Sequence, residues 1–236
     1  MHRPARWGLG AAGAGVAVIV GLEVASLGEM NLLRRTISEH GLGPGGWIFT
    51  VGVALLAVGS AAIGVSLARK RLAGVAGLVA LTGWSVGLLM TAVFHKHDWS
   101  VGPSLSGNIH RAGSLVAFLC LPLAVLIISA PWRGRRPRRR RSATVAFALG
   151  VCSAAWVAGI VTAVLVGADS GLPWYRVVPL GLVERGLAVT EVAALLALGV
   201  WGAARLGPQG GDEVLDVAAE DGGHVDPVRV DQPLRL

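Results

Sequence analysis

The sequence predicts an all-α polytopic membrane protein, a six-helix transmembrane bundle with both termini in the cytoplasm. Of its 236 residues, 53% are hydrophobic and only 15% are charged, whereas soluble domains carry about 25% charged residues. The mean hydropathy is +0.64. Several apolar runs reach roughly 20 residues, the length that crosses the ~30 Å hydrocarbon core of a bilayer as a helix. Composition and run length together exclude an ordinary soluble domain.

Six apolar runs, separated by polar breaks, mark the expected helices in chain order. They cover Trp7–Leu27, Trp47–Leu67, Leu72–Phe94, Ala112–Ala130, Thr144–Val166 and Val183–Ala204. The first run exceeds the apolar core of a typical signal peptide and no small-residue cleavage site follows it, so we interpret it as a span. The segment from Gly167 to Leu182 contains two prolines and fits a short re-entrant or interfacial piece.

The orientation follows from the unequal distribution of lysine and arginine. One side collects thirteen of them: Arg3, Arg6, Arg69, Lys70, Arg71, seven arginines from Arg133 to Arg141, and Arg205. The other side collects six: Arg34, Arg35, Lys96, Arg111, Arg176 and Arg185. The positive-inside bias places the first side in the cytoplasm of a bacterial plasma membrane. The Arg133–Arg141 run is then a topological anchor in contact with anionic lipid, and no nucleic-acid partner is expected.

The chain divides into a membrane bundle, residues 1–206, and an acidic tail, residues 207–236. The tail holds seven of the fourteen acids and few aromatic residues. Such a composition buries too little apolar area to offset the entropy lost on ordering, so we expect a disordered cytoplasmic tail. Both cysteines, Cys120 and Cys152, fall inside apolar runs and imply no disulfide framework.

Small residues recur within the spans at the spacing that lets helices approach closely. Gly83 and Gly87 form a GxxxG motif, which is typical of tight helix packing. We expect packing within the chain, and the same motif also fits a homo-oligomer through Gly83 and Gly87.

On this topology, the polar groups of the bundle gather on the outer side. All seven acids outside the tail lie there, in loops or nearby span halves: Glu23, Glu29, Glu39, Asp98, Asp169, Glu184 and Glu191. Four of the six histidines join them: His40, His95, His97 and His110. Glu184 and Glu191 share one helix face, and Glu191 lies about 10 Å deeper along the axis. A chemical site, where there is one, is therefore expected on the outer side.

Three interpretations of this outer cluster remain open. The first is a polar cap of salt bridges, with Glu184 paired to Arg111 or Arg185 and Glu39 paired to Arg34 or Arg35. The second is a zinc site, for which His95, His97, Asp98 and His110 offer suitable imidazole and carboxylate ligands. The third is a proton-coupled or lipid-binding cavity in which Glu23 and Glu191 are buried acids.

The order of these features resembles a bacterial six-span integral-membrane family catalogued only as a domain of unknown function, common in actinobacteria and archaea. The resemblance rests on "TISEHG" (residues 36–41), "FHKHD" (94–98) and "GNIHRAGS" (107–114). It implies shared polar positions at Ser38, Glu39, Asp98, His110 and Glu184, without assigned roles. His95 and His97 are outside the family pattern.

The same family is distantly similar to eukaryotic membrane proteins named for an FGF-receptor-activating gene, a damage-regulated autophagy modulator and a yeast lipid-asymmetry factor. This likeness implies lipid handling by analogy. The first functional hypothesis is accordingly a lipid-associated membrane protein with a polar outer-facing cavity that holds a lipid-like small molecule. The second is a membrane-embedded enzyme on a lipid-like substrate, either a metal-assisted hydrolase or an acid-driven terpenoid cyclase. For catalysis the candidates are Glu23, Glu39, Asp98, His110, Glu184 and Glu191, and a cyclase would use Glu23 or Glu191 as proton donor.

Overall fold

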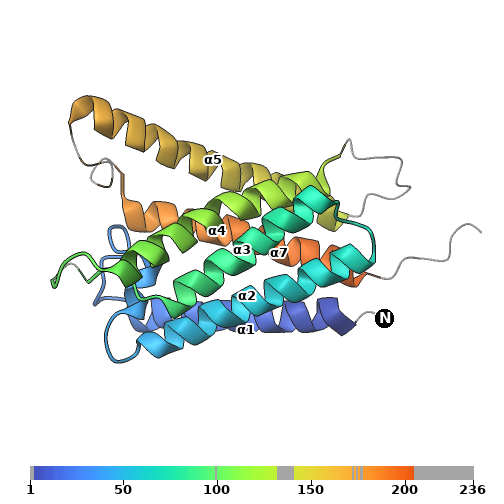
Figure 1. The fold of residues 1–236 in the computed structure, drawn as a ribbon, viewed down its shortest axis with the longest axis horizontal. Coiled ribbons are helices and arrows are strands. Elements are labelled where there is room, and N and C mark those ends of the chain that lie inside the picture. The colour runs from blue at the N-terminus through green and yellow to red at the C-terminus, as the bar shows by residue number, and fades with distance from the viewer. Residues whose placement is uncertain are drawn as a thin grey trace, which may run out of the picture. The chain divides into compact units, whose positions relative to one another are not determined.

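Six α-helices and one short 3₁₀ helix make up the part of the chain that the structure describes (Figure 1). The computed structural model describes residues 3–98, 100–131, 141–171, 173, 175 and 178–204. In chain order the elements are α1 (Arg3–Ala25), η1 (Ile37–Gly41), α2 (Gly46–Arg69), α3 (Val75–Val93), α4 (Leu105–Ser129), α5 (Arg141–Ser170) and α7 (Leu180–Ala203). All six α-helices are long and apolar enough to cross a bilayer, and the described residues contain no strand. The predicted all-α architecture with six helices of membrane-spanning length is confirmed.

The helix boundaries agree with the apolar runs to within a few residues, except at the start of α4. This helix begins at Leu105 rather than at Ala112. Ser104 caps it, because its Oγ accepts a hydrogen bond from the Gly107 N–H at 3.0 Å. The first turns of α4 carry polar side chains such as His110, so hydropathy alone placed the start of the helix too late.

Parts of three predictions lie outside the described residues: the disordered tail at 207–236, residues 132–140 of the arginine run, and several residues of the expected re-entrant piece. At the borders of that piece, α5 continues to Ser170 and α7 begins at Leu180. Both helices therefore extend into the segment that was predicted to hold a re-entrant or interfacial piece.

Helix α7 occupies the central position in the bundle, since it packs against α1, α2, α4 and α5. The other close pairs are successive helices: α1 with α2, α2 with α3, α3 with α4, and α4 with α5. Fully buried Leu121, Leu195 and Leu198 lie in the core between them. The indole of Trp84 is also buried, and its Nε1 donates to Ser60 Oγ at 2.9 Å, so this polar group is satisfied within the core.

Glycines allow the helices to approach to backbone contact. A Cβ on Gly15 of α1 would lie 2.5 Å from the carbonyl oxygen of Gly52 in α2, and a Cβ on Gly87 of α3 would lie 2.6 Å from the carbonyl oxygen of Gly113 in α4. A Cβ on Gly83 would lie 2.8 Å from a side-chain sulfur of α4. The Gly83/Gly87 motif is therefore part of the α3–α4 interface, and an oligomer through the same face would have to separate these two helices.

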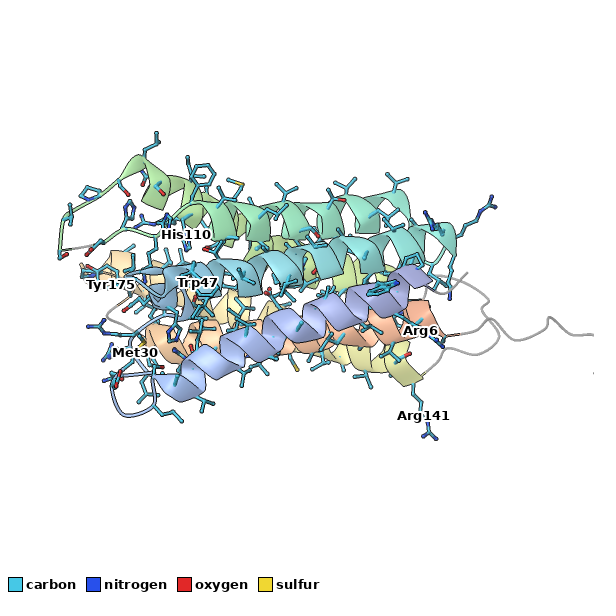
Figure 2. The ribbon with its side chains drawn as sticks, turned by 90° about the horizontal axis from the view of Figure 1, so that it is seen from below. Arg6, Met30, Trp47, His110, Arg141 and Tyr175 are labelled. Atoms are coloured by element: carbon cyan, nitrogen blue, oxygen red, sulfur yellow. The ribbon has the colours of Figure 1, made fainter. Side chains whose placement is uncertain are left out.

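The alternating helices bring the loops together at two opposite ends. Figure 2 shows Met30, Trp47, His110 and Tyr175 at one end, and Arg6 and Arg141 at the other. We call the first the η1 end, because η1 and the α3–α4 loop (residues 94–104) connect helices there. The grouping of loops at each end agrees with the one deduced from the charges.

Candidate functional site

Glu39 in η1 is the centre of a charged cluster between η1 and the α3–α4 loop. Its Oε2 lies 3.1 Å from Arg35 Nη1, and its Oε1 lies 3.3 Å from Lys96 Nζ. Oε1 also accepts the backbone N–H of Thr36 at 3.3 Å, and Lys96 Nζ donates to Thr36 Oγ1. Partial burial opposes the charged form, but Lys96, the Thr36 N–H and Arg35 outweigh it and hold the pKa of the Glu39 carboxyl below its ordinary value. Glu39 is thus a carboxylate at neutral pH, paired with Arg35 as one interpretation predicted.

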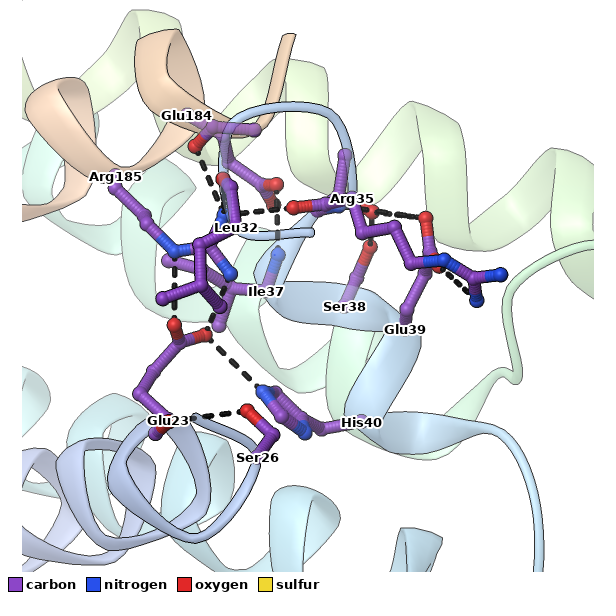
Figure 3. Close-up of polar contacts among 12 residues, drawn as sticks. Glu23, Ser26, Leu32, Arg35, Ile37, Ser38, Glu39, His40, Glu184 and Arg185 are labelled. Atoms are coloured by element: carbon purple, nitrogen blue, oxygen red, sulfur yellow. Dashed lines mark hydrogen bonds and ion pairs between the residues drawn. The ribbon is translucent and has the colours of Figure 1, made fainter. Parts of the chain in front are cut away.

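Arg185 of α7 ties that helix to α1 and to the segment between α1 and η1 (Figure 3). Its Nε lies 2.8 Å from Glu23 Oε2, and its Nη2 lies 3.0 Å from Glu23 Oε1. Its Nη1 donates to the carbonyl oxygens of Leu32, Arg35 and Gly181 at 2.7, 2.6 and 3.0 Å. One guanidinium therefore uses its fixed fork of donors to join two helices and a loop.

Glu23 is shared between two partners from different parts of the chain. Besides Arg185, the ring of His40 lies 3.1 Å from Glu23 Oε1 through its Nε2. The Glu23 side chain is 18% exposed to solvent. The cavity hypothesis treated Glu23 as a buried acid, and this is corrected here: the carboxylate is paired and partly exposed, because the end of α1 brings it beside α7 and η1.

Glu184 does not form the ion pairs that we expected with Arg111 or Arg185. Its Oε2 instead accepts the backbone N–H of Ile37 at 2.9 Å, at the start of η1. Arg111 is exposed, and Arg185 is directed to Glu23. Successive residues of a helix point about 100° apart, so neighbouring Glu184 and Arg185 reach different partners. The carboxyl group of Glu184 therefore positions η1 against α7.

The α3–α4 loop separates its polar side chains rather than gathering them. Asp98 is exposed and accepts the N–H and the hydroxyl of Ser100 at 3.0 and 2.6 Å, and these two bonds hold the pKa of Asp98 below its ordinary value. His97 is buried, and its Nδ1 accepts the Ser104 N–H at 2.9 Å. His95 is exposed.

The four proposed zinc ligands therefore do not form one site. His110 has its Nδ1 2.8 Å from the carbonyl oxygen of Phe94. Across the described part of the chain, no group of three or more His, Cys, Asp or Glu side chains is placed to hold a metal ion. The zinc interpretation required His95, His97, Asp98 and His110 to converge. In the structure His97 is buried, whereas His95 and Asp98 are exposed, and the ring nitrogens of His97 and His110 contact different backbone groups.

A crevice lies at the η1 end, and the centres of water molecules can occupy about 320 Å³ of it. Its polar lining consists of Arg35, Glu39, Lys96, His97, Asp98 and Ser100. The two cationic and two anionic groups balance, so the crevice offers both signs of charge without a large net field. We call it the charged crevice. It brings together Glu39 and Asp98, two of the candidates predicted from the sequence.

Glu191 lies apart from this cluster, near the middle of α7. It is fully buried, and neither of its carboxyl oxygens has a hydrogen-bond partner among the described residues. It belongs to the buried stripe of α7 that also contains Leu187, Leu195 and Leu198. As predicted for an acid at this depth, it faces the interior of the bundle.

Lys96 and Arg185 make more polar contacts than the sequence suggested. The sequence analysis used Lys96 only as a charge that helps to set the orientation. It used Arg185 in the same way and as a possible partner of Glu184, and did not connect it with Glu23. Their contacts could have been suspected from their position beside the ends of predicted spans. There, a long cationic side chain can reach carbonyls and carboxylates of adjoining loops.

A family model described as "Protein of unknown function (DUF998)" matches residues 9–201, from the first turns of α1 to the last turn of α7. No curated protein and no solved structure matches the chain.

Proposed function

The chain belongs to this family of proteins of unknown function, and we propose that it is an integral membrane protein that binds the polar head of a lipid-like molecule in the charged crevice. The observation that carries this proposal is the crevice itself, which lies at one end of six membrane-spanning-capable helices. Lipid heads combine charge and hydrogen-bonding groups, and Arg35, Lys96, Glu39 and Asp98 provide complementary groups of both signs.

The apolar surroundings of the crevice suit the remainder of such a molecule. Trp47, Val101 and Leu105 are exposed at the η1 end, at 66%, 88% and 76% of their full accessibility. Tryptophan is enriched at membrane–water interfaces, where its ring lies at the level of the head groups. A lipid with its head in the crevice would therefore keep its acyl chains beside exposed apolar side chains. The distant resemblance to lipid-related eukaryotic proteins is in line with this proposal.

Lipid retention by the purified protein tests the proposal. We expect native mass spectrometry of protein taken from nanodiscs of phosphatidylglycerol and phosphatidylethanolamine to show bound lipid. Lys96→Met should reduce its retention about tenfold, because a charge-assisted hydrogen bond contributes about 1.5 kcal/mol or more. Arg35 still pairs with Glu39 in this variant, so the fold is expected to persist. Arg111→Met, an exposed cation at the same end, is the matched control. Equal retention by Lys96→Met and Arg111→Met would contradict the assignment of the crevice.

We further propose that the protein lies in a bacterial plasma membrane with its termini and the arginine run of residues 132–141 in the cytoplasm. The excess of lysine and arginine at the Arg6 end supports this orientation. In a background without the two native cysteines, Val101→Cys should react with an impermeant maleimide in intact cells, whereas Arg141→Cys should react only after lysis. The reverse labelling pattern would show that the protein has the opposite orientation.

A membrane-embedded, acid-driven enzyme is the second candidate function, and Glu191 is the observation that favours it. A carboxyl group in the bundle interior without a hydrogen-bond partner is the kind of group that donates a proton to a bound apolar substrate. Glu23, the other proposed donor, is paired with Arg185 and does not support this role. The substitutions of Glu191 described in the Discussion test this candidate.

A further inference from the structure

His110 is a buried histidine whose tautomer is set by the end of α3. The residue is 6% exposed, and its Nδ1 lies 2.8 Å from the carbonyl oxygen of Phe94. A carbonyl oxygen only accepts hydrogen bonds, so Nδ1 carries the hydrogen. Phe94 is the C-cap of α3, where the last carbonyls lack partners within the helix. In the neutral ring, Nε2 is therefore a bare acceptor.

This Nε2 atom is buried and has no hydrogen-bond partner among the described residues. A buried acceptor that is left unsatisfied carries a desolvation cost that a hydrogen-bond donor would remove. A hydrogen-bond donor placed beside Nε2 would therefore be stabilising.

A small cavity adjoins His110 and determines the size of that donor. The space open to the centre of a water molecule is about 10 Å³, which is room for about one water or one hydroxyl group. Thr50 and Thr91 also line the cavity, and their hydroxyls donate to the carbonyl oxygens of Ala92 and Gly87 at 3.1 and 2.9 Å. Because their hydrogens are used in these bonds, the two hydroxyls can only accept a hydrogen bond from a group in the cavity.

Lys96 is a lining residue of both the cavity and the charged crevice. Its ammonium has three donors, and two of them are directed to Thr36 Oγ1 and Glu39 Oε1. The third N–H of Lys96 is not used by these two oxygens. A ligand group that donates to His110 Nε2 and accepts from Lys96 is a hydroxyl, whereas a second ammonium would be repelled by Lys96.

We propose that the His110 cavity is a hydroxyl subsite of the charged crevice, and that the lipid-like ligand carries a hydroxylated head such as glycerol. This inference rests on the proposed function. His110 Nε2 accepts the hydrogen of the ligand hydroxyl, Lys96 donates to its oxygen, and a water molecule takes the same place when no ligand is bound. Lipids that lack the hydroxyl are bound less tightly, since they leave Nε2 without a donor.

The test compares two lipids with the same charge and nearly the same size, phosphatidylglycerol and phosphatidylpropanol. We expect the unaltered protein, in detergent, to bind phosphatidylglycerol about tenfold more tightly, the effect of one hydrogen bond to a buried acceptor. In His110→Asn, the side-chain amide can still donate to the Phe94 carbonyl, but the acceptor at the Nε2 position is lost. The two lipids should then bind equally.

Each outcome bears on a separate proposal. Equal binding of the two lipids by the unaltered protein overturns the hydroxyl subsite and leaves the proposed function intact. Binding of neither lipid overturns the proposed function. A preference for phosphatidylglycerol that survives in folded His110→Asn removes His110 from the subsite. If His110→Asn does not fold, Thr50→Val is used instead. This variant lacks one hydrogen-bond acceptor of the cavity, so its preference for phosphatidylglycerol over phosphatidylpropanol should be smaller. An unchanged preference would contradict the proposed position of the hydroxyl.

Discussion

Replacement of Arg185 by methionine is expected to destabilise the bundle by about 3 kcal/mol, because it removes one partner of a mostly buried ion pair together with three further hydrogen bonds. Methionine keeps the length of the side chain and none of its donors. Glu23 then retains only His40, and the carbonyls of Leu32 and Arg35 lose the donor that links their loop to α7. Thermal unfolding or denaturant titration in detergent micelles measures this loss.

Two comparisons isolate the role of the guanidinium. Arg185→Lys should recover less than half of the lost stability, since one ammonium cannot reach the Glu23 carboxylate and three carbonyls at once. Arg111→Met, which removes an exposed arginine at the same end, should change the stability by less than about 0.5 kcal/mol. If Arg185→Met and Arg111→Met had similar stability, the contacts shown in Figure 3 would contribute little to folding.

The six-helix architecture could be predicted because each span carries its own signal. About 20 apolar residues in a row have one stable arrangement in a bilayer, and this requirement does not depend on the neighbouring helices. The start of α4 was missed for the same physical reason. Its first turns are polar, and what begins the helix is the cap formed by Ser104, which hydropathy does not detect.

The polar contacts could be predicted only where both partners are close in sequence. Arg35 and Glu39 are only four residues apart, on either side of the N-cap of η1. The pairing of Arg185 with Glu23 joins residues from the first and last helices, and the packing of α7 on α1 decides it. The same packing directs Glu184 to the backbone of η1 rather than to an arginine. The position of these groups beside predicted spans identified the end of the bundle on which they lie. Their partners depend on tertiary packing.

Glu191 is a core residue whose replacement is expected to increase stability and, if the protein is an acid-driven enzyme, to abolish activity. The residue lies about 17 Å along α7 from its start, at 1.5 Å per residue, near the midpoint of the 24-residue helix. Its side chain is fully buried in the bundle. With no partner for either oxygen in the described part of the bundle, the carboxyl costs free energy that an apolar side chain would not.

We therefore expect Glu191→Leu to raise the free energy of unfolding by about 1–3 kcal/mol. Glu191→Gln is the matched control and should leave the stability nearly unchanged, because the amide has the same shape and is also unsatisfied. A destabilised Glu191→Leu would mean that a bound molecule or ion satisfies the carboxyl in the native protein. Ionisable residues inside a membrane bundle are costly and commonly mark functional sites. If the protein is an acid-driven enzyme, the stabilised Glu191→Leu variant should lose its activity, whereas full activity in that variant would exclude Glu191 as the proton donor.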